Sequence, residues 1–138
     1  MKKIKKTKKI KKLIPIILSA LMLTGCAGAD GSTNNTYRRI TADEAVLMMA
    51  EEQGYIILDV RRADEFAEGH IPGAINVANE SIGTDEISEL PDKNRLIMVY
   101  CRSGRRSKEA AEKLVKLGYT NIVEFGGIID WKGEIVTD

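Results

Sequence analysis

The chain has 138 residues, which suits a single domain, and its 21 basic and 20 acidic residues give a formal net charge of +1. Eight of the basic residues are lysines within the first 12 positions, so the net charge falls from +1 to −7 once residues 1–25, which hold no acidic residue, are set aside. The remaining acidic domain would be repelled by phosphate backbones, which excludes nucleic acid as a partner.

Residues 1–25 have the pattern of an export signal. The lysines precede an apolar run at residues 13–23, and residues 23–26 (Leu-Thr-Gly-Cys) resemble the bacterial lipobox. This resemblance implies that the signal is cleaved and that Cys26 becomes acylated. The alternative is an uncleaved anchor, but eleven apolar residues fall well short of the ~20 that span a bilayer. We therefore expect a lipid anchor in the membrane and a domain on the extracytoplasmic face of the bacterial cell membrane.

The rest of the chain divides into a tether and a folded domain. Residues 26–36, which begin with the lipidated Cys26, are rich in Gly, Ser, Asn and Thr and predict a flexible tether, whereas residues 37–138 have a globular composition. Hydrophobic patterns predict strands at 37–40, 55–60, 75–77, 96–100 and 121–125. They also predict helices at 41–53, at 63–67, loosely at 82–90, at 108–117, and in a short segment that carries Trp131.

The alternation of strands with helices indicates an α/β fold with a mostly parallel sheet covered on both faces. Asp59 to Arg61 and Cys101 both come at the carboxyl ends of predicted strands, so we expect them at one edge of the sheet. The first long helix should begin at Thr41, which forms a capping-box pattern with Glu44.

The segment after the fourth predicted strand carries the chemistry. Cys101 ends the strand, and a helix begins a few residues later, where backbone N–H groups have no intrahelical partner. Arg102, Arg105 and Arg106 add three cations, and Gly104 allows the backbone to bend around an anion. A thiol of pKa ~8.5 is about 3% ionised at neutral pH, but cations and a helix N-terminus can lower a thiol pKa to roughly 3.5–7.5. We therefore expect an exposed, ionised thiol that prefers small anions, rather than a buried apolar cysteine.

Several separate segments together resemble the rhodanese family of sulfurtransferases over about residues 37–132. They are residues 58–61, 65–66, 69–74, 100–104, 106–107, 118–119 and 126–127, together with Trp131. The resemblance implies a rhodanese-like domain with a five-stranded parallel sheet and helices on both faces. It also implies that Cys101 is the catalytic nucleophile and carries sulfane sulfur as a persulfide.

The resemblance further implies roles for the neighbours of Cys101. The substrate-binding loop would consist of Arg102, Ser103, Gly104, Arg105 and Arg106, with Ser107 donating a hydrogen bond from the start of the helix. Asp59 and Arg61 would brace this loop, and Arg61 would pair with Asp64 or Glu65. Arg105 replaces the smaller polar residue expected there, which favours thiosulfate or another anionic donor. Cyanide or a thiol would accept the sulfur, and neither a metal nor an organic cofactor would be needed.

Two other functions remain open. Phosphatases and arsenate reductases with a similar sheet use Cys-x5-Arg, but the sixth position after Cys101 holds Ser107 instead of arginine, which makes that chemistry less favoured. A rhodanese-like domain could also hold sulfur without turnover, as a carrier or binding module. His70 is the single histidine, and its Gly-His-Ile-Pro-Gly setting favours a role in a turn. Trp131 and Ile128 are expected to cover the core.

Overall fold

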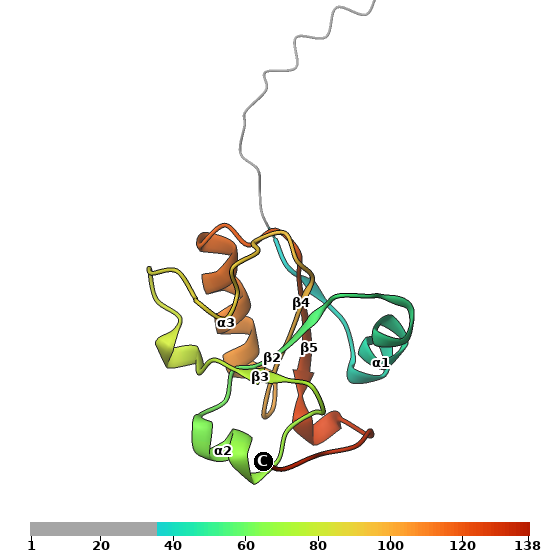
Figure 1. The fold of residues 1–138 in the computed structure, drawn as a ribbon. Coiled ribbons are helices and arrows are strands. Elements are labelled where there is room, and N and C mark those ends of the chain that lie inside the picture. Colours follow the sequence, from blue (N-terminus) through green and yellow to red (C-terminus); the bar gives the residue numbers. More distant parts are fainter. Residues whose placement is uncertain (1–35) are drawn as a thin grey trace, which may run out of the picture. The chain divides into compact units, whose positions relative to one another are not determined.

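The computed structural model of the protein describes residues 36–138 (Figure 1). The predicted signal peptide, Cys26 and the tether up to residue 35 lie outside the described residues, so these expectations stay predictions. Within residues 36–138, no helix has the length and apolar character needed to cross a membrane.

The described chain alternates strands and helices, as the sequence predicted. The elements are β1 (Arg38–Arg39), α1 (Ala42–Glu51), β2 (Ile56–Asp59), α2 (Ala63–Glu68), β3 (Ile75–Asn76), the 3-10 helix η1 (Asn79–Ser81), β4 (Ile97–Cys101), α3 (Arg105–Lys116), β5 (Ile122–Gly127) and the 3-10 helix η2 (Ile128–Asp130). The five strands pair in parallel in the order β1-β5-β4-β2-β3, which confirms the predicted five-stranded parallel sheet.

The central strand β4 is buried on both faces, which explains its continuous apolar sequence. Its side chains alternate: Val99 and Cys101 belong to the core cluster on the α3 side, whereas Met98 and Tyr100 belong to the cluster on the α1 side. Figure 1 shows α1 and α3 on opposite sides of the sheet. Both faces of the sheet are therefore covered, as expected.

The start of α1 follows the predicted capping box. The Thr41 side chain accepts a hydrogen bond from the Glu44 N–H at 3.2 Å, and the Glu44 carboxylate accepts one from the Thr41 N–H at 2.7 Å. The helix ends at Glu51, two residues before the predicted end at residue 53. The sequence therefore determines this helix locally, apart from its last residues.

The loose helix predicted at residues 82–90 is wrong, because this segment contains no helix. Its apolar residues Ile82, Ile87 and Leu90 are nevertheless buried in the cluster beneath α3. The segment lies on the core as an irregular loop, and Tyr119 holds it through a 2.8 Å hydrogen bond from its hydroxyl to the Leu90 carbonyl. Burial of three apolar anchors, rather than helical periodicity, produced the pattern in the sequence.

The short helix expected to carry Trp131 is η2, which ends at Asp130 immediately before it. The Trp131 ring packs against Phe125, with ring centroids 6.1 Å apart, and it joins the α1-side cluster together with Ile128. This arrangement confirms Trp131 as a cover over the core.

The pairing of β4 with β5 contains a bulge next to Cys101. Val99 lies opposite Glu124 and Cys101 lies opposite Gly127, so β5 holds one extra residue between these two pairs. Gly126, within the bulge, has a φ of +87°, a conformation that glycine adopts without strain. The bulge places Gly127 behind the loop that follows Cys101 and leaves Glu124 on the side of α3.

Candidate active site

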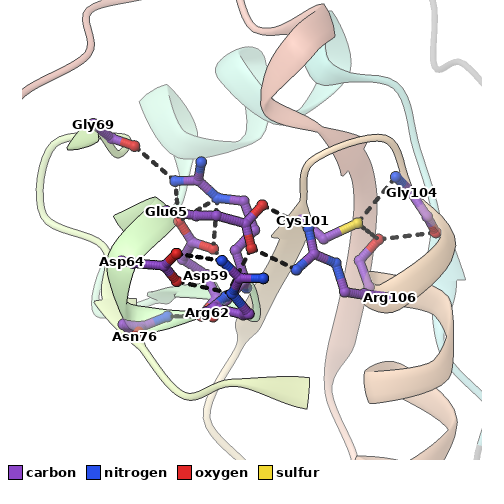
Figure 2. Close-up of polar contacts among 11 residues, drawn as sticks. Asp59, Arg62, Asp64, Glu65, Gly69, Asn76, Cys101, Gly104 and Arg106 are labelled. Atoms are coloured by element: carbon purple, nitrogen blue, oxygen red, sulfur yellow. Dashed lines mark hydrogen bonds and ion pairs between the residues drawn. The ribbon is translucent and has the colours of Figure 1, made fainter. Parts of the chain in front are cut away.

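Cys101 lies at the carboxyl end of β4, where the chain turns into α3 (Figure 2). Its sulfur accepts a hydrogen bond from the Gly104 N–H at 3.0 Å. Gly104 has a φ of +102° and occupies the position before α3 begins, so the predicted sharp bend is present. The prediction of an exposed thiol is wrong, because only 1% of the Cys101 surface is accessible to solvent. The loop of residues 102–106 closes around the sulfur, and substrate must therefore reach it through this loop.

Ser107 lies beside the sulfur, on the first turn of α3. Its Oγ is 3.4 Å from Cys101 Sγ, 3.1 Å from the Gly104 carbonyl oxygen and 2.6 Å from Glu124 Oε1. A hydroxyl has one proton to donate, and the carboxylate is the nearest and only charged acceptor among these. The hydroxyl therefore donates to Glu124 and presents its lone pairs to the thiol, which differs from the expected donation by Ser107 towards the sulfur.

The three arginines of the loop have different surroundings. Arg106 forms a two-pronged ion pair with Glu65 on α2, with N–O distances of 2.6 and 2.9 Å (Figure 2). Arg105 is 73% exposed and pairs with Glu109 one turn further along α3 at 2.7 Å. Arg102 is exposed and has no carboxylate partner within residues 36–138. Of the three, Arg102 is thus the cation available to an incoming anion, whereas Arg106 fixes the loop to α2.

The ion pair between Arg106 and Glu65 should make folding stability depend on pH. The hydrogen bond from Arg106 lowers the pKa of Glu65 from 4.5 to about 2. Because the folded state holds this carboxylate ionised, the stabilisation is present above pH 4.5 and is lost as the pH falls towards 2. For Glu65→Gln we expect a loss of about 1–2 kcal/mol at neutral pH, after discounting for solvent screening, and a smaller difference from the parent at pH 3.

Denaturant unfolding of both proteins at a series of pH values measures this difference. Glu68→Gln, on the exposed side of the same helix, is the matched control and should leave stability nearly unchanged. An equal loss for Glu65→Gln at pH 7 and at pH 3 would contradict the assigned ion pair.

Asp59 and Arg61 meet at the carboxyl end of β2, next to β4, as their positions in the sequence suggested. The Arg61 guanidinium holds the Asp59 carboxylate with two nitrogens, at 3.0 and 2.7 Å, and also donates to the Gly69 carbonyl at 2.7 Å. The expected pairing of Arg61 with Asp64 or Glu65 is therefore wrong, since Glu65 pairs with Arg106. Asp64 pairs with Arg62.

The hydrogen bonds of Asp59 and Arg61 do not reach residues 102–107. Instead, the Arg61 guanidinium lies 5.8 Å from the centre of the Tyr100 ring, the residue before Cys101. Burial is the main cause that raises the pKa of Tyr100, followed by the neighbouring Asp59. The ion pair of Asp59 and Arg61 thus supports the end of β4 through Tyr100, rather than by contact with the loop.

The sequence assigned no role in the site to Gly127 or Glu124, although Gly127 was among the residues that carry the family resemblance. Gly127 packs so closely behind the loop that a Cβ there would lie 2.0 Å from the Arg102 carbonyl oxygen. Glu124 is a buried carboxylate that lies on the same face of β5 as Ile122, two positions earlier. An acidic residue at a core-facing strand position was the available signal for Glu124, because a charge is rarely buried without a partner.

His70, the single histidine, supports the chain near α2. The His70 Nδ1 donates to the Phe66 carbonyl at 2.9 Å, and its ring stacks on Phe66 with centroids 3.7 Å apart. The His70 backbone also pairs with Val136. Among residues 36–138, no group of three or more histidine, cysteine or acidic side chains is arranged to hold a metal ion.

Comparisons with known proteins agree with this geometry. The sequence model of the rhodanese-like domain matches residues 41–134. The chain is 37% identical to the thiosulfate sulfurtransferase PspE of Escherichia coli K12 over 73 residues, which cover 53% of this chain and 70% of that protein. It is 32% identical to the thiosulfate sulfurtransferase GlpE of Coxiella burnetii over 97 residues, covering 70% of this chain and 88% of that protein. The structure of an E. coli rhodanese with anions superposes with a TM-score of 0.56 at 33% identity, covering 61% of this chain and 99% of the other.

Proposed function

Because the chain belongs to the family of rhodanese-like domains, we propose that it is a sulfurtransferase that carries sulfane sulfur as a persulfide on Cys101. The donor is a small sulfur anion such as thiosulfate, and the acceptor is a thiol or cyanide. The observation that carries this proposal is the position of the Cys101 sulfur at the end of β4, where it accepts the Gly104 N–H at the start of α3. Two relatives that carry the name thiosulfate sulfurtransferase support the choice of donor.

The reaction has two exchange steps. Cys101 gives up its proton and its sulfur attacks the outer sulfur of thiosulfate, a new S–S bond forms, and sulfite leaves with the electrons of the broken bond. The acceptor then attacks the outer sulfur of the persulfide and restores the cysteine. Negative charge on the persulfide is stabilised by the Gly104 N–H and by the N–H groups of the first turn of α3, which have no partner within the helix.

Access to the sulfur requires movement of the loop, since Cys101 is buried. The exposed Arg102 attracts the anionic donor to the loop, and outward displacement of residues 102–106 then admits it to the sulfur. Arg106 stays attached to α2 through Glu65, so it limits how far the second half of the loop moves.

The test is to treat the purified whole chain with thiosulfate and to map its peptides by mass spectrometry. We expect one added sulfur on the peptide that contains Cys101, and formation of thiocyanate when cyanide is then supplied. Sulfur on Cys101 without thiocyanate would replace the enzyme with a carrier that transfers sulfur to a specific partner. No added sulfur, combined with release of phosphate from a nitrophenyl ester, would replace it with a phosphatase.

Arg102 and Arg105 should differ in their effects on the donor. For Arg102→Ala we expect the KM for thiosulfate to rise about five- to tenfold, because an unpaired cation is lost from the path of a dianion. Arg105→Ala is the matched control and should change KM less than about twofold, since Glu109 already neutralises that arginine. Steady-state kinetics at low and high salt measure both effects, and a larger effect of Arg105→Ala would reverse the assignment.

We also propose that Cys26 carries the lipid anchor and that the domain acts on the extracytoplasmic face of the bacterial cell membrane. The lysine-rich start, the apolar run and the Leu-Thr-Gly-Cys ending support this proposal. Cells grown with radiolabelled palmitate should label the chain, and Cys26→Ser should remove the label. Label retained by the Cys26→Ser chain would contradict acylation at this residue.

A further inference from the structure

We propose that Cys101 and Glu124 share one proton through Ser107, and that Glu124 stores this proton while the sulfur is loaded. This inference rests on the proposed function, because it concerns the same sulfur. In the resting state Cys101 is a thiol and Glu124 is a carboxylate. In the loaded state the persulfide is an anion and Glu124 is a neutral acid. Glu124 is then a positioning residue, which acts on the sulfur through Ser107.

The three side chains form a continuous hydrogen-bonded row from β4 across α3 to β5. Cys101 Sγ is 3.4 Å from Ser107 Oγ, which is 2.6 Å from Glu124 Oε1. The Glu124 side chain is 2% exposed, and its Oε1 also accepts the Gly126 N–H at 2.9 Å. The bulge in β5 creates this arrangement, since it turns the Gly126 N–H back onto the carboxylate.

The proton balance follows from the single proton of the serine hydroxyl. At rest the thiol donates to Ser107 Oγ, and Ser107 donates to Glu124. When Cys101 attacks thiosulfate, its proton passes to Ser107 Oγ while the serine proton passes to Glu124 Oε1. The Cys101 thiol thus becomes the persulfide anion, the Glu124 carboxylate becomes the neutral acid, and thiosulfate becomes sulfite. The total charge is unchanged. Transfer of the outer sulfur to cyanide reverses the proton movement and releases thiocyanate.

Burial makes this exchange favourable. Two negative charges that share a site shielded from water repel strongly, so one of the two groups keeps the proton. A persulfide is a stronger acid than a thiol, so loading moves the proton towards Glu124. Once protonated, Glu124 donates to Ser107, and the serine hydroxyl turns its own proton to the sulfur anion.

The charged neighbours set the balance between the two states. Arg39 on β1 places its Nε 3.3 Å from Glu124 Oε2 and favours the carboxylate, but its side chain is 60% exposed and therefore screened. Burial, and then Glu112 and Glu124, raise the pKa of Tyr37, so this residue stays neutral. On the sulfur side, Arg106 favours the anion, although Glu65 holds it. These groups oppose one another, which leaves the proton free to move with the charge on sulfur.

The first test is the pH dependence of alkylation of Cys101 by iodoacetamide in the whole chain, which needs no sulfur donor. Glu124→Gln keeps the size and hydrogen-bonding capacity of the side chain but removes its charge. For Glu124→Gln we expect the midpoint of the pH–rate profile to lie about one pH unit or more below that of the parent. At pH values below both midpoints, the variant should then be alkylated about tenfold faster for each pH unit of this shift. Glu112→Gln, which removes an exposed carboxylate from α3, should leave the midpoint in place. An unchanged or higher midpoint for Glu124→Gln would overturn the proposal.

The second test follows the proton in the parent protein and needs no variant to fold. An infrared difference spectrum between the sulfur-loaded and the resting chain should show the carbonyl band of a neutral, buried carboxylic acid, which disappears on addition of cyanide. Glu124→Gln should lack this band. A loaded parent protein without the band would refute proton storage even if sulfur transfer through Cys101 is present. If the chain transfers no sulfur at all, the proposed function fails, and the alkylation profile still measures the coupling between Cys101 and Glu124 because it needs no sulfur donor.

Discussion

Replacing Cys101 with serine should reduce sulfur transfer from thiosulfate to cyanide by at least about a thousandfold, because the proposed nucleophile is lost. A serine hydroxyl is not ionised at neutral pH and forms no persulfide. The measurement is the rate of thiocyanate formation by the whole chain, together with the mass of the peptide that contains residue 101. We expect no added sulfur on that peptide after treatment with thiosulfate.

The same variant must be shown to fold. The serine hydroxyl is close in size to the thiol and has the Gly104 N–H and Ser107 as hydrogen-bond partners, so unfolding free energy should change by less than about 2 kcal/mol. Comparable denaturant curves for both proteins would assign the lost activity to chemistry. Equal rates of thiocyanate formation in a folded Cys101→Ser protein would end the enzymatic proposal.

Gly127→Ala should have the second largest effect, through the position of the loop. An added Cβ would lie 2.0 Å from the Arg102 carbonyl oxygen, 2.4 Å from its carbonyl carbon and 2.6 Å from the Ser103 Cα. All three are backbone atoms, so no side chain can rotate away. We expect the loop to move away from β5, with a loss of about 1–3 kcal/mol in stability and roughly a hundredfold in sulfur transfer, because the Gly104 N–H moves away from the sulfur.

Gly83→Ala is the control for this change. A Cβ at Gly83 meets no atom within 4 Å, so this variant should keep both the stability and the activity of the parent. Thiocyanate formation and denaturant unfolding of the two variants measure the difference. Parent-like activity in Gly127→Ala would show that the loop tolerates displacement by the extra methyl group.

The structure gives the arginines of the loop separate tasks, although they look alike in the sequence. Arg106 is fixed by Glu65 and Arg105 is paired with Glu109, whereas Arg102 has no carboxylate partner within residues 36–138. This division limits the positive charge that a bound anion would meet, so the proposed persulfide would depend more on backbone N–H groups than on guanidinium groups. Such preorganised N–H donors stabilise an anion without having to reorient during the reaction.

The elements of the fold could be read from the sequence because their causes are local. Short continuous apolar runs specify the buried strands, the capping box at Thr41 specifies the start of α1, and Gly104 specifies the bend before α3. The position of Cys101 at the end of a buried strand follows from the same patterns. The segment at 82–90 failed because buried loop residues can reproduce a helical spacing by chance.

The sequence by itself determined the parallel α/β fold, the cysteine at the strand end and the bend of the chain that follows it. Only the tertiary structure decided what surrounds the sulfur: Glu65 reaching Arg106 across 41 positions, Gly127 behind the loop, and Glu124 beside Ser107. These contacts join segments far apart in the chain, and their distances depend on strand order and on a single extra residue in β5. Local patterns fix which face a side chain occupies but not which partner it meets there, and the partner sets whether a buried group carries charge.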